Sequence, residues 1–507
     1  MLFRSLAQKI RKQAHIRIIG DYDVDGVTSS HLFLTALRRV GAKVDVVIPH
    51  RIQDGYGLSL HLLQQAKEDG VDTILTCDNG IAAIDEIAWA KAQKMTVLVT
   101  DHHAVPFEEH EGRRTEKKSL ADAVVNPHQQ DCGYPYKELC GAGVAWNVIR
   151  VLYENYDMDK REAEDLLDFV AMATVCDVMS LTGENRILVK EGLKRIRHTK
   201  NIGLQALMQA CNVQPENISA YHFGYVLGPC VNATGRLDTA RHALRLFETG
   251  QETEAEEIAR DLVDLNQERK ELTLQGVEMA KKLCEEGGYE NDPVLVLFLP
   301  DVHESIAGLI AGRIREMYNR PVFVLTRGEE GVKGSGRSTE NYSMYENMCG
   351  CAELFTKFGG HPMAAGLSLP EENVEKFRRK INENCPLTVE EVCPDIHIDM
   401  AMPVGYASTE LVHQFALLEP FGKDNPSPLF ADRNLSISRM WVIGKNRNVL
   451  RMSVLSEYGQ PVPVIFFGDV ETLFAYFTEK FGQEEVENAL HGRKKPDFIF
   501  YGVYSKD

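Results

Sequence analysis

The chain has 507 residues, of which 44% are hydrophobic and 26% charged; 56 lysines and arginines stand against 74 aspartates and glutamates. A chain of this length is too long to fold around a single hydrophobic core, so two to four domains are expected. A net charge of −18 argues against nonspecific coating of nucleic acid but permits a local basic channel. No apolar run reaches membrane-span length, and the basic segment 1–15 lacks the apolar stretch of a secretory signal.

The eleven cysteines are scattered along the chain. The closest two, Cys349 and Cys351, are separated by one residue, and no C-x-x-C pair exists. A zinc ribbon is therefore improbable, and the pattern predicts reduced thiols in the cytoplasm.

The N-terminal part alternates short β-branched runs with segments of helical spacing. This rhythm predicts a parallel sheet covered by helices, with the active site beyond the carboxyl ends of the strands. The expected strands are Ile16–Ile19, Val44–Ile48, Thr73–Thr76 and Thr96–Thr100, and the expected helices are Gly26–Val40, Leu58–Glu68 and Ile84–Lys94.

A long polar helix, Glu254–Glu286, is expected to connect this part to a second α/β unit that begins at Pro293. In that unit the glycine-rich stretches Gly334–Ser338 and Gly359–Pro362 are expected to be loops. After Pro394, short strand-like runs predict a small, OB-like β-barrel. These runs are Leu435–Ile443, Val449–Leu455, Val462–Phe467 and Phe498–Val503.

Three carboxylates, Asp21, Asp23 and Asp25, directly follow the first expected strand. Carboxylates this close repel one another unless a cation holds them. A calcium EF-hand loop is excluded, because its twelfth position requires Glu and here is Leu32, and because a strand precedes the motif. A solvated acidic turn remains the alternative for this motif taken by itself.

Two neighbouring strands end in similar side chains, Asp78 after one and Asp101-His102-His103 after the next, and Asp177 lies within an apolar run. Parallel strands bring such ends to one edge of a sheet. Carboxylates with imidazoles suit two manganese or magnesium ions, and two such ions suit in-line displacement at phosphorus. The expected arrangement has Asp78 bridging the ions and a hydroxide between them as nucleophile.

The motif Asp101-His102-His103 and the motifs around it resemble the RecJ-type exonucleases of the DHH phosphoesterase superfamily, over nearly the whole chain. The other matching segments are Asp21–Gly26, Gly55–Leu58, Asn126–His128, Cys140–Gly143, Ala173–Leu181, Gly228–Pro229, Asn232–Leu237, His303–Ser305, Gly334–Ser338, Gly359–His361 and Leu418–Gly422. One departure is Ile19, which stands where many superfamily members have His.

The resemblance implies a DHH domain (1–200), a helical connector (201–290), a DHHA1 domain (291–392) and an OB-like domain (393–507). It also implies metal ligands and a catalytic histidine, His103, which contacts or protonates the reacting phosphate. The implied ligands are Asp23, Asp25, Asp78, His102 and Asp177, with Asp21 as a further one.

Substrate contacts are expected from two arginines and a histidine in glycine-rich loops, where Arg337 also serves catalysis. The full expected set is Tyr56, Arg236, His303, Ser335, Gly336, Arg337, Ser338, Gly360 and His361. Tyr56 either stacks on a base or packs in the core. The basic segment Arg186–Lys200 is either a wall of a strand channel or a solvated helix face.

The function expected from the resemblance is a metal-dependent exonuclease that degrades single-stranded DNA from 5′ to 3′ in DNA repair and recombination. Two alternatives stand beside it: a phosphodiesterase for oligonucleotides or cyclic dinucleotides, and a non-enzymatic, Cdc45-like replication scaffold. The expected partners are single-stranded DNA and a single-strand-binding protein or helicase. The chain is expected to be a monomer without membrane contact.

Overall fold

The computed structural model describes the residues 2–51, 54–55, 57–110, 113–289, 292–328, 331–383, 385–387, 396–444, 447–491 and 499–504. By its internal contacts the chain divides into two units, Met1–Pro394 and Asp395–Asp507.

The first unit opens with a five-stranded parallel sheet in the order β2-β1-β3-β4-β7. Its strands are β1 (His15–Ile19), β2 (Lys43–Val47), β3 (Thr73–Cys77), β4 (Thr96–Thr100) and β7 (Ala123–Val125). The helices beside it are α1 (Leu2–Arg11), α2 (Val24–Arg39), α3 (Leu60–Glu68), α4 (Ile84–Ala92) and α5 (Gly141–Asn155). The predicted strand–helix alternation is confirmed.

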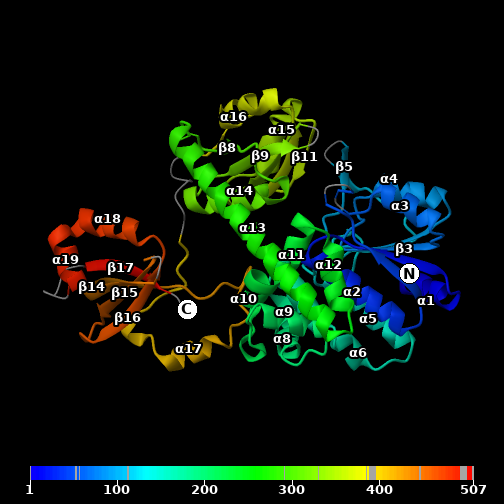
Figure 1. Cartoon of the computed structure of the whole chain (residues 1–507), viewed down its shortest axis with the longest axis horizontal. Coiled ribbons are helices and arrows are strands. Elements are labelled where there is room, and N and C mark those ends of the chain that lie inside the picture. The colour runs from blue at the N-terminus through cyan, green and yellow to red at the C-terminus, as the bar shows by residue number, and fades with distance from the viewer. Residues whose placement is uncertain are drawn as a thin grey trace. The chain divides into compact units, whose positions relative to one another are not determined.

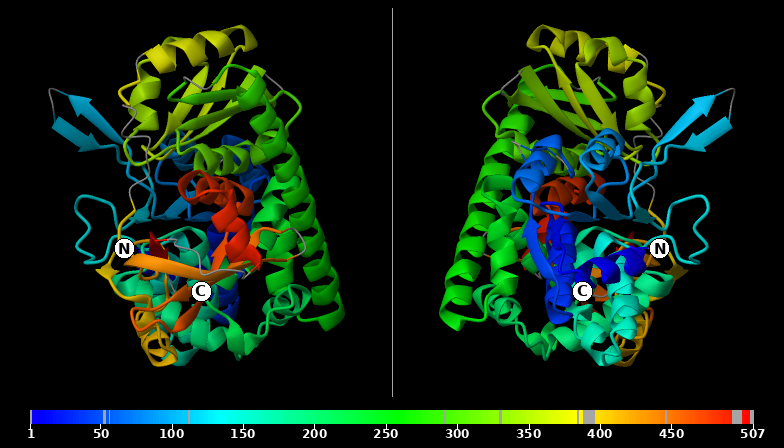
Figure 2. Two further views of the ribbon diagram at one scale, coloured as in Figure 1. Left: turned by 90° about the vertical axis from the view of Figure 1, so that its left-hand side faces the viewer. Right: turned by 90° about the vertical axis from the view of Figure 1, so that its right-hand side faces the viewer.

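Both faces of this sheet are covered. Ile16 and Ile18 of β1 share one core with α1, α2 and α5, whereas Ile19 belongs to a second core with α3 and α4. Successive strand residues point to opposite faces, so a nearly continuous apolar strand is what a sheet covered on both sides requires. Between β4 and β7 a hairpin of β5 (Phe107–His110) and β6 (Arg113–Glu116) projects from the body (Figure 2).

A helical region follows and ends in a long connector. Its helices are α6 (Lys160–Glu164), α7 (Leu167–Cys176), α8 (Gly183–Ile196), α9 (Ile202–Ala210), α10 (Ala220–His222), the π-helical η2 (Phe223–Leu227), α11 (Gly228–Leu237), α12 (Ala240–Glu248) and α13 (Glu252–Glu286). The 35 residues of α13 span about 50 Å at 1.5 Å per residue. Figure 1 shows this helix running from the helical region to the second sheet, as the sequence predicts.

The second sheet has the order β11-β12-β10-β9-β8. Its strands are β8 (Leu295–Phe298), β9 (Val322–Gly328), β10 (Gly331–Arg337), β11 (Lys357–Gly360) and β12 (Ala364–Leu369). The helices α13 and α14 (Ala307–Tyr318) pack on one face, and α15 (Met344–Cys349) and α16 (Val374–Glu383) pack on the other. Within the described part of this second sheet, only β8 and β9 pair in parallel, and the other neighbouring strands pair antiparallel.

The expectation that Gly334–Ser338 is a loop is wrong, because strand β10 runs through Arg337. Its glycines serve close packing rather than turning. A Cβ on Gly334 would lie 2.3 Å from Leu325 Cδ2, and one on Gly336 would lie 2.6 Å from Met344 Sδ. Likewise, β11 extends through Gly360 and includes part of the second expected loop.

The second unit is built on β13 (Met400–Ala401), β14 (Phe430–Ile443), β15 (Val449–Leu455), β16 (Pro461–Phe467) and β17 (Ile499–Tyr504). The long strand β14 pairs with β13, β15 and β17, and β15 pairs with β16. The helices are α17 (Thr409–Phe415), α18 (Val470–Phe481) and α19 (Gln483–His491). Its core includes Ile437, Leu450 and Phe477.

Single turns of 3₁₀ helix complete the described secondary structure: η1 (Pro215–Asn217), η3 (Glu304–Ile306), η4 (Ala352–Leu354), η5 (Glu371–Asn373) and η7 (Val404–Tyr406). None of the helices in the described part of the chain combines the length and apolar character that crossing a bilayer demands.

Candidate metal centre and arginine pocket

The predicted metal-ligating side chains meet at the carboxyl edge of the first sheet. The acidic triplet follows β1, Asp78 follows β3, His102 and His103 follow β4, and Asp177 caps the C-terminus of α7. Potential ligand atoms lie within 4.8 Å of one another in three overlapping groups. These groups are Asp21, Asp23 and Asp78; Asp25, His102 and Asp177; and Asp78, His102 and His103.

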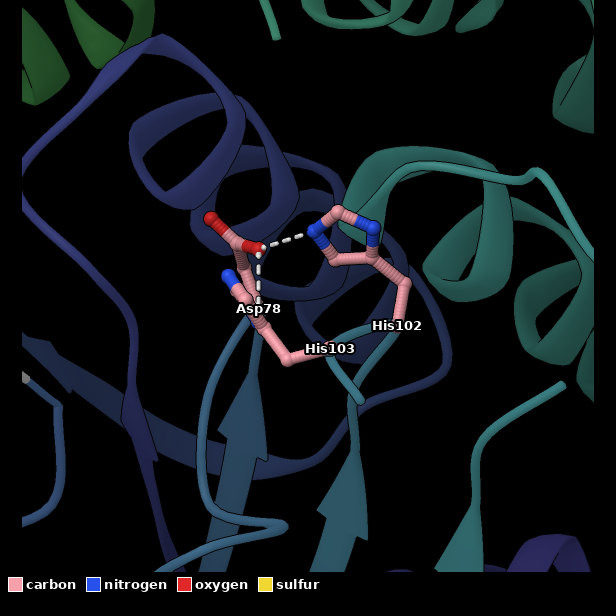
Figure 3. A group of neighbouring side chains, drawn as sticks. All are labelled: Asp78, His102 and His103. Carbon is pink, nitrogen blue, oxygen red and sulfur yellow. Dashed lines mark ion pairs between the residues drawn. The ribbon is translucent and has the colours of Figure 1, made fainter. Parts of the chain in front are cut away.

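His102 lies at the centre of the cluster. Its Nε2 is 3.1 Å from Asp78 Oδ1, 3.6 Å from an oxygen of Asp25 and 3.6 Å from an oxygen of Asp177. Asp78 Oδ1 also lies 4.0 Å from His103 Nδ1, and Figure 3 shows both imidazoles beside this carboxylate. Asp78 belongs to two of the three groups, as does His102, and its bridging role stays a prediction.

Helix α5 holds Asp25 in place. The first two amides of the helix, from Gly141 and Ala142, donate to the two oxygens of Asp25 at 2.6 and 2.7 Å. The N-terminus of a helix carries a partial positive charge that stabilises a carboxylate. Gly141 is required there, because a Cβ would lie 2.6 Å from Asp78 Cβ. The sequence motif Cys140–Gly143 thus has a physical role that residue patterns did not reveal.

Burial and mutual repulsion raise the pKa of several carboxyl groups in the metal-free protein. Burial is the larger cause for Asp21, Asp23 and Asp78, and neighbouring carboxylates add to it. Since both causes disfavour the ionised form, a cation that neutralises the cluster would return these groups to carboxylates.

His103 is paired with the acid of its own motif. Its Nδ1 lies 2.8 Å from Asp101 Oδ1, which also accepts from the backbone amides of His102 and His103. Burial opposes protonation, but the hydrogen bond and charge of Asp101 prevail and raise the pKa of His103 to about 9. Asn126 donates to the His103 carbonyl at 2.9 Å and so fixes the backbone at this position.

The donor set fits divalent cations. Asp21 is 2% exposed, and its Oδ1 has no hydrogen-bond partner within the described residues. A buried carboxylate oxygen without a partner is costly unless a ligand completes it. Oxygen donors with one or two imidazoles suit manganese and magnesium. Ile19, in place of the superfamily histidine, is fully buried in an apolar core and offers no ligand.

A cavity of about 480 Å³ adjoins the cluster. Tyr22, which stands between two of the predicted metal ligands, forms part of its wall. Three arginines also line it. Arg51 follows β2, Arg236 lies in α11 and Arg337 lies in β10. The remaining lining includes Ser305, Gly308, Lys333, Ser335 and Lys357.

These arginines are held by their own neighbours. Arg337 Nη1 donates to the Gly336 carbonyl at 2.7 Å and to Ser335 Oγ at 3.2 Å, and Arg236 Nη1 donates to the Ser305 carbonyl at 2.7 Å. Burial and then Arg51 lower the pKa of Arg236 to about 10, and the same two causes lower the pKa of Arg337. The cavity therefore concentrates positive charge in a site suited to an anion.

The expected positions of these residues need one correction. Arg236 was expected in a glycine-rich loop but lies in helix α11, and Arg337 is the last residue of strand β10. Arg51 was not predicted, since a single arginine after a strand carries no pattern. Its Cζ lies 4.9 Å from the ring centre of Tyr22.

Several other expected contact residues lie outside the cavity lining. His303 Nδ1 is 2.6 Å from Ser305 Oγ and therefore contacts a lining residue. Ser338 is buried and donates to the Tyr342 carbonyl. Gly336, Gly360 and His361 do not line the cavity, although Gly359 does. Tyr56 lies outside the described residues.

Comparison with known proteins agrees with this architecture. Residues 15–174 match the DHH family N-terminal domain, residues 291–385 the DHHA1 domain, and residues 398–487 the RecJ OB domain. The single-stranded-DNA-specific exonuclease RecJ of Haemophilus influenzae is 35% identical over 474 residues, which are 90% of this chain and 80% of that protein. The Bacillus subtilis RecJ is 33% identical over 459 residues, covering 90% of this chain but only 56% of that protein.

Solved structures give the same result. RecJ from Thermus thermophilus in complex with Mn²⁺ has a TM-score of 0.75 and 28% identity, covering 90% of this chain and 65% of that one. An exonuclease RecJ bound to manganese has a TM-score of 0.65 and 31% identity, covering 77% of this chain and 95% of that one.

A DHH domain followed by a DHHA1 domain, with acidic and imidazole side chains gathered at the edge of the first sheet, defines a member of the DHH superfamily of phosphoesterases. Within that superfamily, the chain belongs to the RecJ family. It spans little more than half the length of the Bacillus subtilis member.

Proposed function

We propose that the chain is a metal-dependent exonuclease that hydrolyses single-stranded DNA in DNA repair and recombination. The observation that carries the proposal is the adjacency of two sites. Asp21 and Asp23 belong to the metal-ligand cluster, and Tyr22 between them lines the arginine cavity. A phosphate bound by the arginines would therefore place the neighbouring phosphodiester close to the cluster, which favours cleavage near a strand end.

Each group has a proposed role. Asp21, Asp23, Asp25, Asp78, His102 and Asp177 would hold two manganese or magnesium ions. Bound ions would supply charge stabilisation and water activation for displacement at phosphorus. The terminal phosphate would be bound by hydrogen bonds from Arg51, Arg236, Arg337 and Ser335. We propose that five further residues assist phosphate binding: His303, Gly336, Ser338, Gly360 and His361. Tyr56 is proposed to stack on a base.

His103 is proposed to donate a proton to the leaving oxygen. The contact between its Nδ1 and Asp101 Oδ1 favours the protonated ring, because it raises the pKa of His103. The same contact fixes the plane of the ring beside Asp78. Asp101 would then act as a positioning residue, with its carboxylate held by the Ile81 amide at 2.8 Å.

The relatives that carry the name RecJ are single-stranded-DNA-specific exonucleases, and the solved RecJ structures contain manganese or magnesium. These facts support the proposed substrate and cofactors. We further propose a monomer in the cytoplasm that works with a single-strand-binding protein or a helicase.

The test uses single-stranded DNA with a 5′ phosphate, labelled at either end, incubated with the protein and Mn²⁺. A 5′-to-3′ exonuclease releases a labelled mononucleotide at once from the 5′-labelled strand, and progressively shorter labelled fragments from the 3′-labelled strand. Immediate mononucleotide release from the 3′ label would reverse the polarity. Cleavage of dinucleotides but not of longer strands would favour the oligonucleotide phosphodiesterase instead.

A further inference from the structure

Two cysteines outside the candidate site lie close enough to react with each other. Cys211 follows helix α9 as its C-cap, and Cys230 lies in α11; their Sγ atoms are 3.8 Å apart. Cys230 is 2% exposed, whereas Cys211 is half-buried and reaches the surface. A disulfide requires about 2.05 Å between the sulfurs, so its formation requires side-chain rotation and a shift of the two helices toward each other.

The surroundings distinguish the two thiols. Asn266 of α13 donates to Cys230 Sγ at 3.4 Å, and Arg269 donates to Asn266 Oδ1 at 2.9 Å. The contact with Cys230 and then the charge of Lys270 lower the pKa of Cys211, although burial opposes this shift. The contact with Cys211 and burial raise the pKa of Cys230. Cys211 thus has the exposure and the lowered pKa expected of an attacking thiol, and the buried Cys230 lies next to it.

We propose that Cys211 is a peroxide-sensitive modification site and that Cys230 resolves it into a reversible disulfide. The Cys211 thiolate attacks one oxygen of a hydroperoxide; an S–O bond forms, the O–O bond breaks, and the leaving oxygen takes a proton. The Cys230 sulfur then attacks the sulfenic sulfur, forming the S–S bond and releasing the oxygen as water. The two thiols lose two electrons in total, and the hydroperoxide gains them.

The disulfide would act on the arginine cavity through α11. That helix also carries Asn232, whose Oδ1 accepts from the Val24 amide at 3.1 Å, and Arg236, which lines the cavity. The cross-link would close a loop containing η1, α10 and the π-helical η2, and would draw α11 toward α9. A shift of α11 would move Arg236 away from a phosphate in the cavity and weaken their paired hydrogen bonds. Oxidation is therefore expected to weaken substrate binding.

The first measurement is independent of the proposed nuclease function. Full-length protein with Mn²⁺ is treated with hydrogen peroxide, alkylated without reduction and digested for mass spectrometry. The expected result is a linked pair of peptides that contain Cys211 and Cys230, restored to free thiols by dithiothreitol. Oxidation of the exposed Cys349 without this linked pair would overturn the proposal.

The second measurement assigns the effect on function and rests on the proposed nuclease activity. After peroxide removal, wild type should lose about tenfold in kcat/KM on single-stranded DNA, mostly through KM, which is the scale of losing one hydrogen bond to a charged group, and recover with dithiothreitol. Cys211→Ser should keep basal activity and lose the peroxide response, whereas the control Cys349→Ser should respond like wild type. An equal response of Cys211→Ser and wild type would overturn the regulatory role. A reduced protein without activity would contradict the proposed function and leave the linkage result standing.

Discussion

At the scale of single residues, Asp78 combines a chemical and a conformational requirement. Its φ of +61° lies in the left-handed region, which few residues other than Gly, Asn and Asp adopt easily. Its carboxylate lies within two of the three ligand groups. A substitution that removes the charge should therefore keep the backbone preference, which makes Asn more informative than Ala.

Asp78→Asn should abolish hydrolysis in saturating Mn²⁺ and leave the fold intact. Without metal, its thermal midpoint should equal or exceed that of wild type, because one source of carboxylate repulsion is gone. The stabilisation that Mn²⁺ gives wild type should shrink in the variant. Asp85→Asn, an exposed acid in α4, is the control. Near-normal cleavage by Asp78→Asn would show that Asp78 does not bridge the ions.

Arg337→Ala should lower kcat/KM on 5′-phosphorylated strands by about 10²-fold, the scale of losing one oriented donor to a developing negative charge. Arg337→Lys should recover only part of this loss, because an ammonium cannot form the paired contacts of a guanidinium. Steady-state kinetics on 5′-phosphate and 5′-hydroxyl strands measures both effects. The exposed Arg313→Ala is the control. A Lys variant as active as wild type contradicts paired contacts.

At this scale the sequence predicts the metal ligands well and the supporting residues poorly. Asp78 and His102 follow strands, so topology alone brings them together. Arg51, however, reaches the cavity from a segment without a motif, and the contact between Gly141 and Asp25 spans 116 positions. Contacts of this kind depend on packing that no local pattern encodes.

At the scale of elements, apolar strands were predictable nearly to the residue. Thr96–Thr100 and Val449–Leu455 have the predicted bounds, since β-branched alternation identifies a strand directly. The glycine-rich strand β10 was mistaken for a loop, because the side chains that exclude a Cβ there come from distant elements. Gly308 of helix α14 is also close-packed: an added Cβ would lie 2.8 Å from Arg337 Nη2 and from Ser335 Oγ.

Gly308→Ala is expected to separate stability from binding. Alanine favours a helix over glycine by about 0.5–1 kcal/mol, yet its methyl group would push Arg337 from its position. KM for single-stranded DNA should therefore rise. Gly312→Ala, in the same helix and with no atom within 4 Å of the added Cβ, should leave KM unchanged. Equal KM values for the two variants would place the substrate phosphate away from α14.

A pH dependence is expected from Asp168 in the first turn of α7. Burial raises the pKa of this carboxyl to about 6, although the Thr199 hydroxyl donates to it at 2.6 Å. The folded-state pKa is above the unfolded value, so the contribution to stability is complete below about pH 4 and is lost as pH rises through about 6.

Asp168→Asn removes this titration. Relative to wild type, its free energy of unfolding should increase by about 2–3 kcal/mol between pH 4 and pH 7.5, at 1.36 kcal/mol per pKa unit. Urea unfolding in EDTA at both values measures the difference. The control Asp264→Asn lies on an exposed face of α13 and should show no such trend. A constant difference between variant and wild type would mean that Asp168 is not protonated in the folded state near pH 5.

At the scale of the whole molecule, the charge of −18 coexists with a concentrated positive cavity. The predicted succession of two α/β parts and a β-rich part is confirmed by the matched family domains. The sequence could not show which basic residues share a surface, since that depends on how helices and strands from separate regions pack together.

Deleting residues 395–507 should weaken the binding of long DNA strands without affecting the catalytic step. An OB-fold typically contacts about 4–16 nucleotides, so KM for a long strand should rise whereas hydrolysis of a very short oligonucleotide changes little. The salt dependence of long-strand binding should also flatten, because fewer phosphates are neutralised. A length series with intact and truncated protein, preceded by a check of thermal unfolding, tests this. Equal loss at every length would assign the second unit a folding role.

Tyr22 stands between two predicted metal ligands, Asp21 and Asp23, and lines the cavity with the three arginines, so binding at the two sites is expected to be coupled. Ions in the acidic cluster would remove negative charge facing an incoming phosphate, and a phosphate among the arginines would relieve repulsion among cations. If bound ions increase the affinity for DNA by some factor, thermodynamic linkage requires that bound DNA increase the affinity for the ions by the same factor. The metal ions and the DNA phosphate are therefore expected to bind cooperatively. The state in which the acidic cluster holds its ions and the arginines hold a phosphate is the one expected to cleave.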